Sequence, residues 1–160
     1  MSNELSTYLT FRVIDHHFGV SVDKVMEISE YKQPKPIPES PAYMLGVVEF
    51  RDQVIPLIDT AQKFNLPPID INPLTCVVVL ELENMDLAKK FKVAILVDAV
   101  SDVFEADDEE IKTLSDDFSP EYIKASHKTE NGLVMILDAD KVFSVKDVIT
   151  LDKLIVNLRS

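Results

Sequence analysis

The 160-residue chain has little of several things on which protein chemistry commonly depends. It contains one cysteine and three glycines, and its apolar runs are only a few residues long. A single cysteine excludes an internal disulfide, and Cys76, inside the apolar run 76–79, is expected to be a buried core thiol rather than a nucleophile. No Gly-rich phosphate cradle is present. Runs this short do not span a bilayer, so no direct membrane insertion is expected.

Basic residues are also scarce. Lys and Arg number 16 against 28 Asp and Glu, which gives a formal net charge of −12. Nucleic acids and anionic membranes require clustered cations, so neither is expected as a partner. The first residues are polar instead of basic and then apolar, so no secretion signal is predicted and a cytoplasmic protein is expected.

The most informative stretch is 46–59, GVVEFRDQVIPLID. Two short apolar, β-branched runs flank the residues Phe50–Gln53, and this pattern predicts a two-stranded hairpin. Arg51 stands at the tip of that hairpin. A lone arginine at a hairpin tip is either solvated or in contact with a partner, and the sequence pattern favours the solvated state.

Several other segments have readable patterns. Residues 8–14 alternate in polarity and predict a strand, followed by a turn that holds His16 and His17. From Asp23 to Ser29 the apolar spacing favours a helix of about two turns. The four prolines in 33–41 predict a stiff, extended connector.

The chain repeats part of itself. Residues 41–64 align without a gap on 120–143, at an offset of 79, and residues 22–28 align on 97–103, at an offset of 75. We therefore predict a mainly β single domain over 6–150, made of two β-barrel subdomains at about 15–64 and 74–143, with strand exchange possible at the boundary. Residues 144–160 are a C-terminal extension, either a helix or an added strand.

The sharpest catalytic hypothesis is a small acid/base hydrolase that uses Glu49 and Asp59. Asp59 and Asp138, however, hold the same repeat position before short helices, and helix capping explains both. His16 and His17 are adjacent, so on a strand they would point to opposite faces and bind no common metal. The sequence predicts no catalytic residue, no cofactor and no metal.

The repeat separates scaffold from surface. Arg51 aligns with Glu130, so the tip charge belongs to one half only. Glu27 lies off the apolar stripe of its own segment, and the pattern favours a solvated carboxylate there. Residues that the scaffold does not need are the better candidates for partner contact.

Six segments in order carry a resemblance to a known family: Tyr8–Ile14, Val22–Ile28, the proline-rich connector ending at Tyr43, Gly46–Asp59, Val97–Val103 and Asn131–Asp138. In these segments the chain resembles CheW, the coupling protein of bacterial chemotaxis. The resemblance implies two SH3-like five-stranded barrels with a groove between them and no catalytic activity. It also implies a cytoplasmic adaptor, recruited to membrane-bound receptor arrays, that bridges the chemoreceptor tip and the regulatory domain of a CheA-type histidine kinase.

The resemblance also implies a receptor-binding set. The matching positions are Val25, Glu27, Ile28, Gly46 and Arg51. The family's hairpin usually has glycine after the arginine, whereas Asp52 stands there in this chain, so another backbone solution is expected for the turn. Asp52 and Glu49 flank Arg51 with acid and are candidates to pair with it. The alternatives are the coupling module of a CheV-like or variant chemosensory system and, from another class, the hydrolase.

Overall fold

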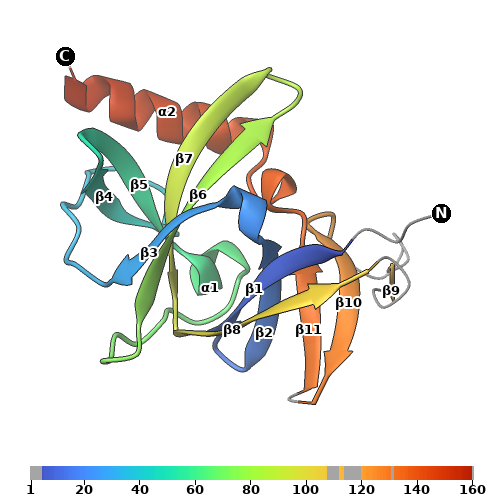
Figure 1. Cartoon of the computed structure of the whole chain (residues 1–160). Coiled ribbons are helices and arrows are strands. Elements are labelled where there is room, and N and C mark those ends of the chain that lie inside the picture. The colour runs from blue at the N-terminus through green and yellow to red at the C-terminus, as the bar shows by residue number, and fades with distance from the viewer. Residues whose placement is uncertain (1–4, 108–111, 114–119, 131, 160) are drawn as a thin grey trace.

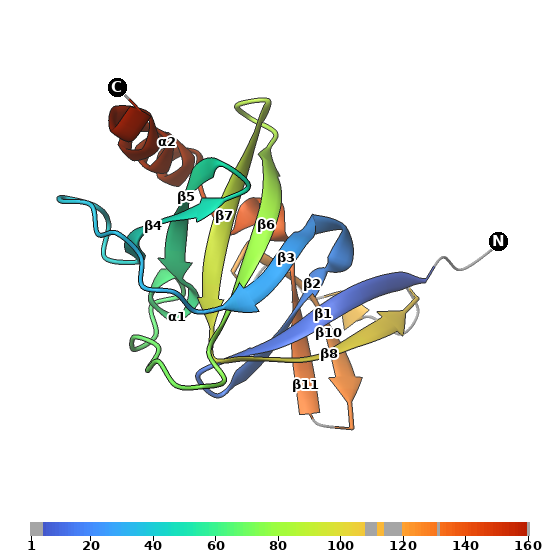
Figure 2. The same cartoon turned by 60° about the vertical axis from the view of Figure 1, so that its left-hand side comes forward.

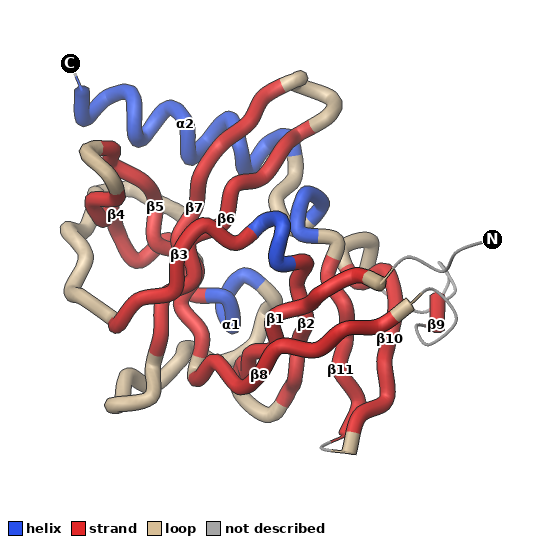
Figure 3. Tube along the Cα trace, in the orientation of Figure 1, coloured by secondary structure: helices blue, strands red, loops and turns tan. Residues whose placement is uncertain are grey.

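The computed structural model describes residues 5–107, 112–113, 120–130 and 132–159, and strands dominate it (Figure 3). The strands are β1 (Ser6–Val13), β2 (His16–Ser21), β3 (Val25–Glu30), β4 (Met44–Phe50), β5 (Gln53–Asp59), β6 (Cys76–Asn84), β7 (Lys89–Val97), β8 (Ala99–Ala106), β9 (Lys112–Thr113), β10 (Ile123–Thr129) and β11 (Gly132–Leu137). The helices are the 3₁₀ turns η1 (Val22–Lys24) and η2 (Ala139–Lys141), the short α1 (Thr60–Lys63) and the longer α2 (Val145–Arg159).

The strands form two sheets. Sheet A has the order β8-β1-β2-β11-β10-β9, and sheet B has the order β3-β6-β7-β5-β4. The two views in Figures 1 and 2 show the sheets side by side, with α2 lying against β5 of sheet B. The connector 31–43 leaves β3 and returns to pair with β4 at Lys35 and Val47.

Five strands of each sheet repeat one pattern. The order β3-β6-β7-β5-β4 matches β8-β1-β2-β11-β10, and each set has a single parallel pair. In sheet B that pair aligns Leu57 with Ala94, and in sheet A it aligns Ile136 with Gly19. These residues are related by the offsets of 79 and 75, so the sequence repeat is a repeat of backbone structure.

The sheets exchange strands between the two parts of the chain. Sheet B combines β3, β4 and β5 with β6 and β7, while sheet A combines β1 and β2 with β8, β10 and β11. Each sheet therefore draws on both predicted segments, 15–64 and 74–143. The division of the chain into domains at those boundaries stays a prediction.

The two sheets share one main hydrophobic core. Phe11 and Val13 of sheet A belong to the same buried cluster as Leu57 and Leu82 of sheet B. Phe64, just after α1, stacks on Tyr122 with ring centroids 4.6 Å apart. A core shared in this way fits a chain too small to bury two independent ones.

The helix predicted for Asp23–Ser29 is wrong. Only Val22–Lys24 forms a helical turn, and β3 starts at Val25 and pairs antiparallel with β6. Over six residues an apolar pattern does not separate a helix from a strand, and the ladder with β6 decides the outcome. A bulge between Val25 and Glu27 shifts the register, and this shift mimics a helical spacing.

Two smaller expectations also change, and the alternatives left open for 144–160 are resolved. His16 and His17 both lie on β2, because the turn comes earlier, at Ile14, whose φ is 56°. Cys76 is half-buried at the start of β6, and its thiol donates to the Leu74 carbonyl oxygen at 3.2 Å. The extension is a helix, α2. The dipeptide Asn131–Gly132 favours a hairpin turn, but Asn131 lies outside the described residues.

Candidate functional site

The edge strand β3 presents the first part of the candidate site. Glu27 and Ile28 are exposed, Ile28 by 45%, while Val25 is half-buried. Among the described strands only β6 pairs with β3, so the other edge of the strand faces away from the sheet. An acidic and an apolar side chain are therefore both exposed on this edge strand.

Gly46 supports the same sheet from its opposite edge. Register pairs connect Glu27, Val79, Ala94, Leu57 and Gly46 across all five strands of sheet B. Gly46 itself is buried, with φ +151°. A Cβ built there would lie 2.3 Å from the carbonyl oxygen of Lys35, so the glycine lets the connector cross the strand.

Arg51 stands at the tip of the β4–β5 hairpin, as predicted. Phe50 pairs with Gln53, and the two residues between them, Arg51 and Asp52, have φ values of 47° and 63°. Two left-handed residues in a two-residue loop are characteristic of a type I′ turn, which matches the twist of the strands. Asp52 thus takes up the left-handed conformation itself, and the expectation of another backbone solution is wrong.

The Arg51 side chain is exposed and stacks on its neighbour. Its guanidinium lies 4.7 Å from the centroid of the Phe50 ring, a cation–π distance. Among the described residues, Arg51 makes no ion pair with Glu49, Asp52 or Glu27. The stacking leaves the guanidinium edges open to a partner.

The acid/base pair of the hydrolase hypothesis does not form. Glu49 pairs with Val54 near the hairpin tip, and Asp59 lies five residues further along β5, about 17 Å away at strand spacing. Asp59 is 1% exposed, and its carboxylate accepts from the backbone amides of Ala61, Gln62 and Ile69. The Asp59 carboxylate therefore caps α1 and also holds the loop at Ile69.

Asp138 behaves differently from Asp59, although both hold the same repeat position. Its side chain caps no helix, and it lies 3.9 Å from Lys141. The expectation of a capping role is therefore confirmed for Asp59 and wrong for Asp138. Among the described residues, no cluster of His, Cys, Asp and Glu is arranged to hold a metal ion.

The structure also brings forward residues that sequence reasoning did not include in the site. Edge strand β8 of sheet A carries Asp102 and Val103 at the positions that match Glu27 and Ile28. Both are exposed, Val103 by 51%. The sequence repeat could have identified these residues, because the offset of 75 aligns 22–28 with 97–103.

Comparisons with known proteins identify the family of the chain. The CheW-like domain model matches residues 7–147. The chain belongs to the CheW-like domain family. It is 30% identical over 139 residues to a probable chemotaxis protein CheW of Rhizobium etli. The aligned region covers 85% of this chain and 86% of that protein. It is 27% identical over 148 residues to the chemotaxis protein CheW of Bacillus subtilis, with 89% and 91% covered.

A solved structure shares the fold. The scaffolding protein TtCheW of Thermoanaerobacter tengcongensis superposes with a TM-score of 0.75 at 20% identity, covering 90% of this chain and 96% of that one. The predicted mainly β fold with SH3-like character is confirmed. The relatives are named as chemotaxis proteins and the solved structure as a scaffolding protein, and this chain, as a member of the CheW-like family, is a non-catalytic protein. In the described residues no helix is long and apolar enough to cross a membrane.

Most of helix α2 lies beyond the part of the chain that the CheW-like model matches. Its first turn is fixed by Asp147, whose carboxylate accepts from the Ser144 amide at 2.9 Å and from the Tyr43 hydroxyl at 2.8 Å. Lys63 of α1 lies 3.5 Å from the same carboxylate. The C-terminal helix is thus tied to the end of the connector and to α1.

These contacts shift two pKa values. Burial alone would raise the pKa of Asp147, but the hydrogen bonds from Ser144 and Tyr43 and the charge of Lys63 outweigh it and hold that pKa below its usual value. Burial, together with the bond to Asp147 and its negative charge, raises the pKa of Tyr43 well above the usual tyrosine value. Asp147 is therefore ionised and Tyr43 neutral across the physiological range.

Proposed function

We propose that this chain is a non-catalytic adaptor that couples the cytoplasmic tip of a chemoreceptor to a CheA-type histidine kinase. The observation that carries the proposal is the exposed β3 edge together with the open guanidinium of Arg51, on a chain of the CheW-like family. An adaptor requires a rigid scaffold and a few anchoring side chains, and it needs no reactive centre.

The receptor-binding set divides into two roles. Glu27, Ile28 and Arg51 are exposed and would contact the receptor directly, with apolar contact from Ile28 and charge from the other two. Val25 is half-buried and Gly46 is buried. We assign these two the role of shaping the sheet beneath the contact residues.

The place of action follows from the partners. Chemoreceptors present their signalling tips in the cytoplasm, so the adaptor would work there, held at the receptor arrays by its partners. The charge of −12 supports recruitment by protein contacts, because an acidic protein is repelled by an anionic membrane surface.

The test measures receptor binding for Arg51→Ala and Glu27→Ala. An arginine at the centre of an interface is a frequent hot spot, so we expect Arg51→Ala to weaken binding by roughly 2 kcal/mol or more, and Glu27→Ala to weaken it less. The measurement is co-sedimentation with receptor and kinase, after circular dichroism has confirmed the fold. Glu130→Ala, at the matching tip of the other hairpin, is the control. Unchanged co-sedimentation of both variants would sink the proposal.

A further inference from the structure

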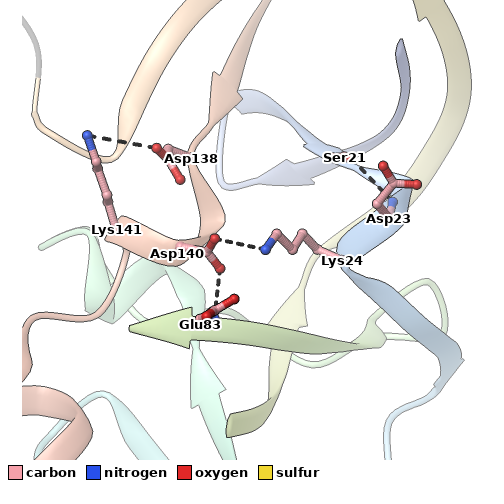
Figure 4. A network of polar contacts seen from close by, with 7 residues as sticks. All are labelled: Ser21, Asp23, Lys24, Glu83, Asp138, Asp140 and Lys141. Atoms are coloured by element: carbon pink, nitrogen blue, oxygen red, sulfur yellow. Dashed lines mark hydrogen bonds and ion pairs between the residues drawn. The ribbon is translucent and has the colours of Figure 1, made fainter. Parts of the chain in front are cut away.

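Asp140 fastens the start of β3 to the rest of the molecule. One of its carboxylate oxygens accepts from the Lys24 ammonium at 2.8 Å, and the other accepts from the backbone amide of Glu83 at 2.9 Å (Figure 4). Lys24 directly precedes Val25, Glu83 lies on β6, and Asp140 lies in η2 after the last strand of sheet A. A single carboxylate therefore connects the exposed edge, its neighbouring strand and the end of the other sheet.

The link lies where β3 has the least support. As an edge strand β3 pairs only with β6, and the first pair, Val25 with Leu80, is followed at once by the bulge. Glu83 lies three residues beyond Leu80 on β6, past the end of the ladder. Asp140 thus connects the start of β3 to β6 at the point where backbone hydrogen bonding between the two strands ends.

The ion pair between Lys24 and Asp140 is partly shielded from water. The side chains of Lys24 and Asp140 are 32% and 26% exposed, so most of each lies out of water. The Asp140 carboxylate also has a backbone amide as its second partner. Charge-assisted hydrogen bonds in such surroundings are stronger and better oriented than ion pairs on an open surface.

The other half of the molecule holds its matching strand without this device. In sheet A the amide of Ile14 donates to Asp98 at 2.5 Å, and Asp98 directly precedes β8. Asp23, which matches Asp98, is exposed instead, and the residue that matches Asp140 is Ala61. Strand β8 is therefore anchored through Asp98 to the β1–β2 turn, 84 residues earlier in the chain, whereas β3 is anchored through Lys24 to η2, 116 residues later.

We propose that Asp140 and Lys24 are positioning residues for receptor binding, a role that rests on the proposed function. They fix the direction in which β3 leaves η1, and so they set how Glu27 and Ile28 are presented together. They act through β3 and require no contact with the receptor.

The experiment is a double-mutant cycle with Lys24→Met, Asp140→Asn and the two combined. The probe is the cytoplasmic signalling fragment of a chemoreceptor from the same organism, titrated calorimetrically. We expect each single variant to bind roughly fivefold more weakly, a size typical of coupled pairs. We expect the double variant to bind no more weakly than the worse single variant, because both changes remove the same link. Lys24→Arg keeps the donor and should retain the affinity.

A second measurement is independent of the receptor. Amide NMR shifts of Val25–Ile28 in the free protein should move in Lys24→Met, which keeps the contact between Asp140 and Glu83, if the link orients β3. This arm also decides the matter should Asp140→Asn not fold. The matched control is the ion pair between Lys89 and Asp152, 2.7 Å apart between β7 and α2. Lys89→Met and Asp152→Asn should leave both the affinity and the β3 shifts unchanged.

The outcomes separate this inference from the proposed function. Additive losses would mean that Lys24 contacts the receptor itself, and unchanged affinity would mean that the link has no influence on binding. Either result overturns the positioning role while Arg51→Ala still weakens binding. If Arg51→Ala and Glu27→Ala leave the affinity unchanged, the proposed function itself fails.

Discussion

The hairpins β4–β5 and β10–β11 have almost the same backbone and different side-chain roles. Each has a register shift at the matching place, Met44/Gly46 in one and Ile123/Ala125 in the other. Each also ends with the same bond, from Asp59 to the Tyr43 carbonyl and from Asp138 to the Tyr122 carbonyl, both 2.8 Å. Arg51 stands where the second hairpin has Glu130. The backbone is duplicated scaffold, so specific roles have to be sought in the side chains that differ.

The largest expected difference concerns the two matched aspartates. Asp59→Ala removes a buried carboxylate and leaves three backbone amides without a partner, so we expect a loss of roughly 4 kcal/mol in the free energy of unfolding. Asp138→Ala removes only a long, half-exposed ion pair, and its cost should stay below about 1 kcal/mol. Urea denaturation of both variants measures the difference. Equal losses would contradict the functional separation of the two positions.

The second difference concerns Gly46 and its counterpart Ala125. Gly46→Ala would place a Cβ against the backbone of Lys35 at a positive φ, and we expect it to cost about 3 kcal/mol. In the other hairpin this position is already alanine, and Ala125→Gly should cost about 1 kcal/mol, through chain entropy and the loss of one buried methyl group. Thermal and urea unfolding measure both. A Gly46→Ala variant as stable as the parent would mean that the connector readily moves away.

The sequence predicts much of this comparison, but not all of it. The repeat and the alternating runs predict the hairpin, the tip position of Arg51 and the cap at Asp59, because these depend on residues close together in the chain. A strand exchange at the boundary was expected only as a possibility, because the choice of which strands pair depends on contacts between distant parts of the chain, which local patterns do not encode.

The helix expected over Asp23–Ser29 failed for a related reason. A six-residue apolar pattern with a bulge fits either period, and only the ladder with β6 decides between them. The contact of Asp140 with Lys24, 116 residues apart, has no sequence signal at all. Within the candidate site, the exposure of Glu27 and Arg51 was predictable, whereas the burial of Gly46 under the connector was not.

A third difference concerns helix α2, which lies against sheet B. Tyr43 and Tyr122 hold matched positions and burial raises the pKa of both, but only Tyr43 donates to Asp147. Because the pKa of Asp147 is lowered in the folded protein, its stabilisation is complete above the usual value of 3.8 and is lost as the pH falls through the folded pKa. We expect Asp147→Asn to cost about 1 kcal/mol at pH 7 and to approach the parent in acid.

Urea unfolding of the parent and of Asp147→Asn between pH 7 and pH 2.5 checks this prediction. Asp152→Asn is the control, since its pair with Lys89 is well exposed and should show a small, flat difference. A constant gap between the parent and Asp147→Asn at every pH would contradict the assignment. At high pH the raised pKa of Tyr43 gives the opposite sign: the contribution of Tyr43 is present below pH 10 and is lost as the pH rises further.

The smallest expected effect concerns Asp52, where the tip of this chain departs from the glycine usual in its family. Its φ of 63° costs an aspartate some strain that a glycine avoids, but glycine also loses more chain entropy on folding. Asp52→Gly should therefore stabilise the protein by only about 0.5 kcal/mol. Asp15 lies in the β1–β2 turn, and its own φ is not positive. Asp15→Gly should therefore destabilise the protein by a similar amount.

Receptor binding is the second property to measure for Asp52→Gly. Because the left-handed turn already exists with aspartate, Asp52→Gly should leave Arg51 in place and leave receptor affinity within about twofold, a free-energy change below 1 kcal/mol. A gain of tenfold or more would show instead that the Asp52 carboxylate competes with the receptor for Arg51. An unchanged affinity would mean that Asp52 serves only the turn. A large gain would mean that Asp52 lowers the affinity of Arg51 for the receptor.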